Sequence, residues 1–255
     1  PEQLTGKILR LTRDGQPVVD NPFGEASAVW ALGLRNTFGL AFNPLDGQLY
    51  GSENGPTVDD EVNRLVAGAN YGWPLYTGSP GEPGFEDALT TWNPNICPTG
   101  LAVYCGSNYP EEYLGDLFMG TCMRGGIRRL ELSTDGQRIV RQDDDWWSQA
   151  LEGLDDVQRY YGVLDVVNGP DGNLWFSTAE GIYRLVYGDA PAGPADLDCD
   201  LFDGVFPGNP GDDDDSSDVV YKKCSCGLAA GVDTAGLCTA WMLVALLAVR
   251  RRGSP

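Results

Sequence analysis

The chain has 255 residues, with 17 Lys and Arg against 37 Asp and Glu, a formal net charge of -20 and no histidine. This length allows one large or two modest domains. The acidic excess makes nucleic acid and anionic membranes poor partners and divalent cations better ones, although surplus Asp and Glu can equally serve only to solvate the surface. Without histidine, the chain lacks the commonest general base and the commonest transition-metal ligand.

A four-residue pattern of apolar residue, any residue, Arg and Leu recurs along the first 187 residues, at intervals of about 55 to 65 residues. Its arginines are Arg10, Arg64, Arg129 and Arg184. The last three copies each follow a Gly-x-Leu-aromatic run, which begins at Gly47, Gly115 and Gly172. The first copy follows Pro1 so closely that we interpret it as the end of a unit already under way, and we expect a truncated N-terminus.

Turn residues separate the apolar runs inside each repeat. Pro44-Leu45-Asp46-Gly47 and Pro170-Asp171-Gly172-Asn173 place Asp-Gly between two strand-like runs, which is a strong hairpin signal. The order strand, turn, strand, loop, strand predicts an all-β fold, and the spacing is typical of β-propeller blades. We therefore expect an incomplete propeller over residues 1–187, with about three blades plus one leading strand; the alternative is a β-sandwich with coincidental echoes.

The seven cysteines begin with Cys97 and Cys105, which flank a short segment and suit a disulfide in an oxidising compartment. Buried free thiols are the alternative. Residues 188–223 are rich in Pro, Gly and Asp and predict a solvated linker. The four aspartates 212–215 within it lack the alternation of an EF-hand loop, so a charged spacer is favoured over a calcium site.

Residues 224–255 contain a Cys-Ser-Cys motif, an apolar segment and three consecutive arginines, residues 250–252. These features predict a C-terminal transmembrane helix with its arginine end in the cytoplasm, which puts the propeller outside the cell. The tail resembles the C-terminal sorting tails of myxobacterial surface proteins, and this resemblance implies processing near the cysteines and display at the outer surface. A plain membrane anchor is the alternative.

Residues 33–74 carry most of the chemistry. Gly55-Pro56 forms a turn whose carbonyls suit a cation, and residues 59–61 add three carboxylates. Arg35, followed by Asn36, suits a bidentate carboxylate ligand at the mouth of a strand. The aromatic turn at residues 70–74 suits either stacking on a sugar or capping of the sheet.

Five motifs in order give the chain a specific resemblance over about residues 6–187. They are GKILRL at residues 6–11, Gly-x-Arg-Asn at 33–36, Ser-Glu-x-Gly-Pro at 52–56, Asp-Glu-Val-Asn at 60–63 and Asn-Tyr-Gly-Trp-Pro at 70–74. The chain resembles the second half of the PQQ-dependent aldose (glucose/sorbosone) dehydrogenases. That six-bladed propeller family also contains non-catalytic members resembling Hedgehog-interacting protein.

This resemblance implies a set of site residues. Arg35 and Asn36 contact the PQQ cofactor, with Arg124 as a third contact, although the local alignment can equally offer Met123. The carbonyls of Gly55 and Pro56 bind the calcium ion that polarises PQQ, while Glu61 and Tyr71 join a second, structural calcium site. No catalytic residue is expected in this chain, because the family's base is a histidine that would lie upstream.

Some positions depart from the family pattern. Leu34 and Asn54 replace histidines of the Gly-His-Arg-Asn and Ser-Glu-His-Gly-Pro motifs. Two arginines that the family places ahead of the last Asp-Val fall on Gly162 and Leu164. Those arginines balance PQQ carboxylates, so their loss weakens the cofactor site.

The sequence thus predicts a fragment of a surface-displayed, PQQ- and calcium-dependent sugar dehydrogenase that oxidises aldoses at the anomeric carbon, with an unknown electron acceptor. The alternative is a non-catalytic, calcium-stabilised propeller that binds glycans or proteins at the cell surface. At Glu61 the alternative to a calcium ligand is a side chain that only caps a turn.

Overall fold

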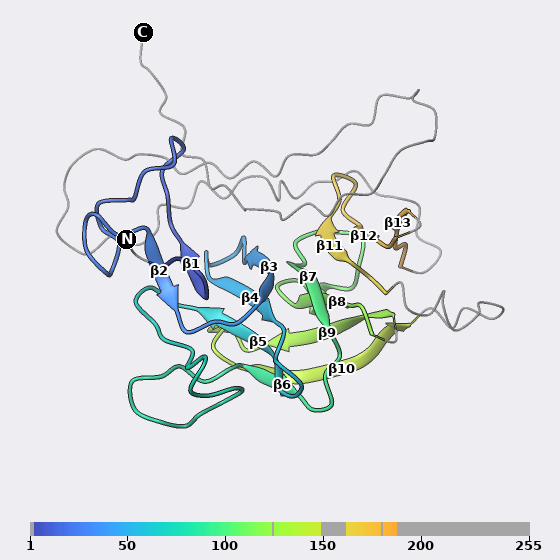
Figure 1. Ribbon diagram of the computed structural model, residues 1–255. Helices are drawn as coiled ribbons and strands as arrows, with labels where there is room; N and C mark the ends of the chain where they lie inside the picture. Colours follow the sequence, from blue (N-terminus) through green and yellow to red (C-terminus); the bar gives the residue numbers. More distant parts are fainter. Residues whose placement is uncertain (1–2, 124, 149–161, 180, 188–255) are drawn as a thin grey trace, which may run out of the picture.

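The computed structural model describes residues 3–123, 125–148, 162–179 and 181–187. Within these ranges the chain forms strands, turns and one short 3-10 helix, η1 (Glu111–Tyr113). A small sheet of β1 (Lys7–Leu9) and β2 (Val29–Leu32) is followed by three larger antiparallel sheets (Figure 1). Their strands are β3 (Thr37–Phe42), β4 (Leu49–Glu53), β5 (Asp60–Leu65) and β6 (Thr90–Trp92); β7 (Pro98–Val103), β8 (Leu117–Thr121), β9 (Gly126–Leu132) and β10 (Ile139–Ser148); and β11 (Asp165–Asn168), β12 (Leu174–Ser177) and β13 (Ile182–Arg184).

Within each large sheet the strands lie side by side in chain order. The first strand of each sheet packs against the first strand of the next, β3 against β7 and β7 against β11. Sheets that fan outward from their first strands are the arrangement of successive propeller blades. The expected all-β series of three sheets is confirmed, except that the leading piece has two paired strands rather than one.

The apolar core is divided into layers between neighbouring sheets. One cluster includes Tyr50 and Val62 of the first large sheet with Leu101 and Met119 of the second. Two further clusters lie between the second and third sheets and between β1–β2 and the first large sheet. Because the inner strands are covered on both faces, every residue of β4, β7 and β8 is buried, and these strands show no alternation of apolar and polar residues.

The hairpin between β3 and β4 follows the predicted turn chemistry. The Asn43 side chain accepts from the Leu45 N–H at 3.0 Å, and the Gly47 N–H donates to the Asn43 carbonyl at 2.8 Å. Gly47 has a φ of 74°, in the left-handed region that glycine enters without steric cost. The Asp-Gly pair therefore closes the hairpin and sets the register of β3 on β4.

The expected disulfide between Cys97 and Cys105 is wrong. Cys97 bonds to Cys122, with 5.2 Å between their Cα atoms, and Cys105 is disulfide-bonded but not to Cys97. The reason is the strand between them: Cys97 precedes β7 and Cys105 lies beyond its other end. At roughly 3.3 Å per residue, β7 holds the two cysteines about 20 Å apart, far beyond disulfide reach.

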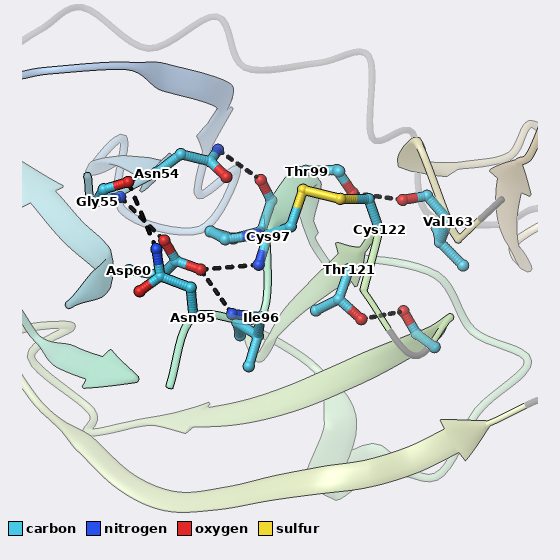
Figure 2. The surroundings of a disulfide bond; sticks show 12 residues. Asn54, Gly55, Asp60, Asn95, Ile96, Cys97, Thr99, Thr121, Cys122 and Val163 are labelled. Carbon is cyan, nitrogen blue, oxygen red and sulfur yellow. Dashed lines mark hydrogen bonds between the residues drawn. A yellow bond between two sulfur atoms is a disulfide. The ribbon is translucent and has the colours of Figure 1, made fainter. Parts of the chain in front are cut away.

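A buried carboxylate connects this disulfide to the first large sheet (Figure 2). Asp60, at the start of β5, accepts from the Gly55 N–H at 2.9 Å and from the N–H groups of Ile96 and Cys97 at 2.7 Å each. Asp60 is 1% exposed. Its three hydrogen bonds therefore hold the turn after β4 against the segment that enters β7.

The predicted linker, 188–223, and the predicted transmembrane tail, 224–255, lie outside the described residues. Among the residues that are described, none belongs to a helix that could cross a membrane.

We expect Asp60→Asn to lower the free energy of unfolding by about 1–3 kcal/mol. Both carboxylate oxygens of Asp60 accept N–H groups, whereas an amide has only one acceptor oxygen, so the substitution leaves at least one buried N–H without a partner. Chemical denaturation of the oxidised protein measures this loss. Asp87→Asn is the matched control, since exposed Asp87 accepts a single backbone hydrogen bond, from Gly81 at 2.8 Å. Equal stabilities of the two variants would contradict the role given to Asp60.

Candidate functional site

Residues 35 and 36 lie between β2 and β3, and their backbone is fixed by a buried glutamate. Glu53, the last residue of β4, accepts from the N–H groups of Arg35, at 2.8 Å, and Asn36, and from the Thr37 hydroxyl at 2.6 Å. Burial raises the pKa of Glu53 above its usual range despite these donors. Glu53 stands within the Ser-Glu-x-Gly-Pro motif, but the sequence analysis assigned no role to its side chain.

The Arg35 side chain lies across the Gly55 turn. Its Nη1 donates to the carbonyls of Asn54 at 2.8 Å and Gly55 at 3.1 Å, and its guanidinium carbon is 5.7 Å from the centre of the Trp73 ring. The Gly55 carbonyl, which we expected to face calcium, thus faces a positive charge of the protein. In this arrangement the predicted cofactor-side calcium site and Arg35 compete for the same oxygen.

One small cleft brings most of the predicted site residues together. Arg35, Gly55, Pro56, Glu61 and Tyr71 all line it, and the other lining residues are Gly33, Leu34, Glu53, Trp73, Tyr76 and Thr77. Its cavity volume of about 10 Å³ is close to what one water molecule, and hence one ion, occupies. The exposed Asn36 is not among the lining residues, and Arg124 lies outside the described residues.

Glu61 is one of two buried carboxylates that line this cleft, with Glu53 as the other. The Glu61 oxygens accept from the Gly78 N–H at 2.5 Å and from Asn63 Nδ2 at 3.0 Å. Burial, with smaller contributions from the carboxylates of Glu53 and Asp59, raises the pKa of Glu61 from 4.5 to about 7.

The surroundings of Glu61 fit a calcium ion. The buried Oδ1 of Asn63 has no hydrogen-bond partner among the described residues, although the amide of the same side chain reaches Glu61. Calcium prefers carboxylate, amide and carbonyl oxygens. Within the described ranges no three His, Cys, Asp or Glu side chains form a ligand cluster, so neutral oxygens have to complete any such site.

The other predicted oxygen donors are already engaged. Both Asp60 oxygens accept backbone N–H groups, and Asp59 accepts from the Thr77 hydroxyl at 2.9 Å. The Tyr71 hydroxyl donates to the Arg64 carbonyl at 2.6 Å and accepts from the Val66 N–H at 2.9 Å. Of the carboxylates at residues 59–61, only Glu61 lines the cleft, and Tyr71 can serve an ion only through an atom other than its hydroxyl.

The structure also explains the departures from the family pattern. Leu34, at the first histidine position, is 2% exposed and packs in an apolar cluster. Asn54, at the second, donates from Nδ2 to the Pro98 carbonyl of β7 at 2.9 Å. At Gly162 a Cβ atom would lie 2.3 Å from the Thr121 carbonyl oxygen. This backbone position therefore has no room for arginine. The other position, Leu164, is 39% exposed.

Three antiparallel blades with an ion-sized cleft beside the turn after β4 define a propeller with a candidate cation site. Comparison with known proteins identifies the family. Residues 1–186 match the family described as glucose/sorbosone dehydrogenase, and the chain belongs to this family.

Three relatives illustrate the similarity. The chain is 30% identical over 202 residues to the aldose sugar dehydrogenase YliI of Escherichia coli, covering 72% of this chain and 51% of the relative. It is 49% identical over 85 residues to quinoprotein glucose dehydrogenase B of Acinetobacter calcoaceticus, covering 32% and 18%. The PQQ-bound structure of aldose sugar dehydrogenase from Streptomyces coelicolor superimposes with a TM-score of 0.56 at 30% identity, covering 77% of this chain and 51% of that one. The first two curated relatives in the comparison are about twice as long as the segment that matches them.

The raised pKa of Glu61 predicts a pH-dependent stability in calcium-free buffer. Between pH 4.5 and 7 the folded protein holds a proton that the unfolded chain has released, so the free energy of unfolding falls as pH rises across this window, by up to about 3 kcal/mol. Denaturant titrations at pH 5 and pH 8 measure the fall. Glu61→Gln should flatten it, whereas Glu82→Gln, which changes an exposed carboxylate, should leave it unaltered. An unchanged slope in Glu61→Gln would refute the assignment.

Proposed function

We propose that this chain is part of a PQQ- and calcium-dependent sugar dehydrogenase that oxidises aldoses at the anomeric carbon. The observation that carries the proposal is the single cleft that collects Arg35, Gly55, Pro56, Glu61 and Tyr71 from separate segments of a glucose/sorbosone dehydrogenase fold. These are residues that the family resemblance assigns to cofactor and calcium. Because the chain spans about half the length of its curated relatives, the activity is proposed for the whole protein.

Each group in the cleft has a definite part in this proposal. PQQ, when bound, supplies the hydride acceptor, and calcium supplies a Lewis acid. Arg35 offers its guanidinium to an anionic oxygen of the cofactor, and it must leave the Gly55 carbonyl if that oxygen binds calcium. Glu53 keeps the backbone of Arg35 and Asn36 in place during this exchange. The family's base is a histidine, and the proposal assigns that role to no residue of this chain, which contains none.

A second candidate function is a calcium-stabilised propeller that binds glycans or proteins without catalysis. It is favoured by Gly162, where the family's arginine has no room, and by the contact of Arg35 with two backbone carbonyls. Both features reduce the positive charge available to PQQ carboxylates. On either function we propose export, with anchoring of the propeller at the outer cell surface through residues 224–255.

The dehydrogenase proposal predicts that the full-length protein, incubated with PQQ and calcium, reduces an artificial electron acceptor when glucose or another aldose is added. Arg35→Ala should weaken PQQ binding at least about tenfold, because one charge-assisted hydrogen bond is worth about 1.5–3 kcal/mol. Absorbance titration with PQQ and dye reduction measure the two effects. Arg138→Ala, which removes an exposed arginine outside the cleft, is the matched control.

Two results would separate the candidate functions. PQQ binding with aldose-dependent dye reduction supports the dehydrogenase. Absence of both, in a protein that calcium still stabilises, overturns the dehydrogenase and supports the binding propeller.

The calcium proposal has its own test, which needs no cofactor. Adding calcium should raise the melting temperature at pH 8, where Glu61 is ionised, and raise it less at pH 5, where a proton competes with the ion. Glu61→Gln should remove most of the calcium effect, and Glu82→Gln should keep it. A full calcium-dependent rise in Glu61→Gln would rule out this site.

A further inference from the structure

In three of its four copies, the repeated arginine of the sequence pairs with an aspartate. Arg129 on β9 donates to Asp116 at 2.6 Å, and both side chains are almost completely buried. Arg10 pairs with Asp20 at 2.9 Å and Arg184 pairs with Asp171 at 3.2 Å. A guanidinium at this repeat position therefore lies against an aspartate in three of the four copies.

Arg64, the remaining copy, has no hydrogen bond or ion pair from its side chain to any residue in the described part of the chain. The register shows how Arg64 differs from Arg129. Phe118 lies opposite Arg129, and Asp116 precedes it by two residues; Tyr50 lies opposite Arg64, and the residue two before it is Gln48. A neutral amide thus stands where the second large sheet has the carboxylate. The register does not separate Arg64 from Arg184, whose sheet also has an amide, Asn173, at this position while Arg184 pairs with Asp171.

Gln48 cannot replace the missing charge. Its Nε2 donates to Asp46 Oδ2 at 3.0 Å and to the Asp135 carbonyl at 2.8 Å, and its Oε1 has no hydrogen-bond partner within the described residues. The first large sheet therefore leaves the Arg64 guanidinium without a protein partner among the described residues and the buried Gln48 Oε1 without a hydrogen bond. In the second large sheet the corresponding groups satisfy each other.

Arg64 and Gln48 line the same cavity, which is separate from the cleft around Glu61. Its volume is about 160 Å³, and the remaining lining residues are Trp30, Gly47, Leu49, Leu65, Val66 and Ala67. The indole of Trp30 comes from β2 and the other residues from the ends of β4 and β5. One cation, one amide, one indole and an aliphatic wall are the elements of a small-ligand site.

We propose that this cavity binds a carboxylate-bearing sugar, a hexuronate unit of an acidic glycan. The guanidinium of Arg64 donates to the sugar carboxylate, which takes the place that Asp116 has beside Arg129. Trp30 offers an aromatic surface to the apolar face of the sugar ring, and the Gln48 amide lies among its hydroxyls. The site is distinct from the proposed dehydrogenase cleft and does not depend on PQQ.

The charge of the protein does not prevent this binding. The net charge of -20 repels an anion at long range, but salt screens charges beyond about 8 Å at physiological ionic strength. The nearby Asp46 carboxylate already accepts from the backbone N–H and the side-chain amide of Gln48. Arg64 therefore remains the group that a carboxylate meets in the cavity, and binding should weaken as salt is raised.

The test is isothermal titration of the full-length protein with galacturonate, galactose and acetate. We expect galacturonate to bind at least about tenfold more tightly than the other two, because only it carries both the carboxylate and the sugar ring. Gln48→Asp should reduce galacturonate binding at least about tenfold while keeping the melting temperature, since it rebuilds the pair seen between Asp116 and Arg129. Arg64→Gln should reduce binding similarly.

The matched control is Arg10→Gln, which changes the same repeat position at a copy that already has its carboxylate. It should leave galacturonate binding unchanged. No galacturonate binding by the unaltered protein, or equal binding by Gln48→Asp, overturns the proposal. Acetate that binds as tightly as galacturonate also overturns it and indicates a general anion site, and galactose that binds as tightly excludes Arg64 as the recognising group.

Discussion

The carboxylate of Asp60 fixes the position of everything around the candidate site. It is buried and hydrogen-bonded to three backbone N–H groups, one in the turn after β4 and two at the entrance to β7. Cys97, one of these donors, is bonded to Cys122 beyond β8, so the same contact extends into the second sheet. The backbone of the Gly55 turn is consequently tied to two blades at once. A cofactor site built on such a turn is preorganised by a structural residue that contacts no ligand.

Most of the fold followed from the sequence because each blade repeats the same local signals. Asp-Gly turns at Gly47 and Gly172 lie where hairpins form, and three of the four recurrent arginines lie on the third strand of a sheet. The disulfide was missed for the opposite reason, since pairing depends on where strands end in space and Cys97 and Cys105 are separated by the whole of β7. The strand pair β1–β2 was only half predicted, because Val29–Leu32 belongs to no repeated pattern.

The site was predictable as a set of positions and much less so as a set of contacts. The motifs located the segments that line the cleft. They could not distinguish Glu61, which lines the cleft, from Asp60, whose oxygens already accept hydrogen bonds from backbone N–H groups. Nor could they reveal the buried acceptor role of Glu53. The Gly-x-Leu-aromatic runs already align Gln48 with Asp116, but only the structure shows that Asp116 pairs with Arg129 and that Gln48 does not pair with Arg64.

The outermost strand of the second sheet, β10, has β9 on one side and no strand partner on the other within the described residues. Three consecutive aspartates, Asp143 to Asp145, stand on this strand, and Asp144 also reaches Arg128 and the Trp92 indole. A long strand with free backbone groups invites pairing with a second molecule, and like charges on it oppose that pairing because two such strands would bring their carboxylates together. If many copies are held side by side on a cell surface, the aspartates of β10 keep neighbouring molecules from joining edge to edge.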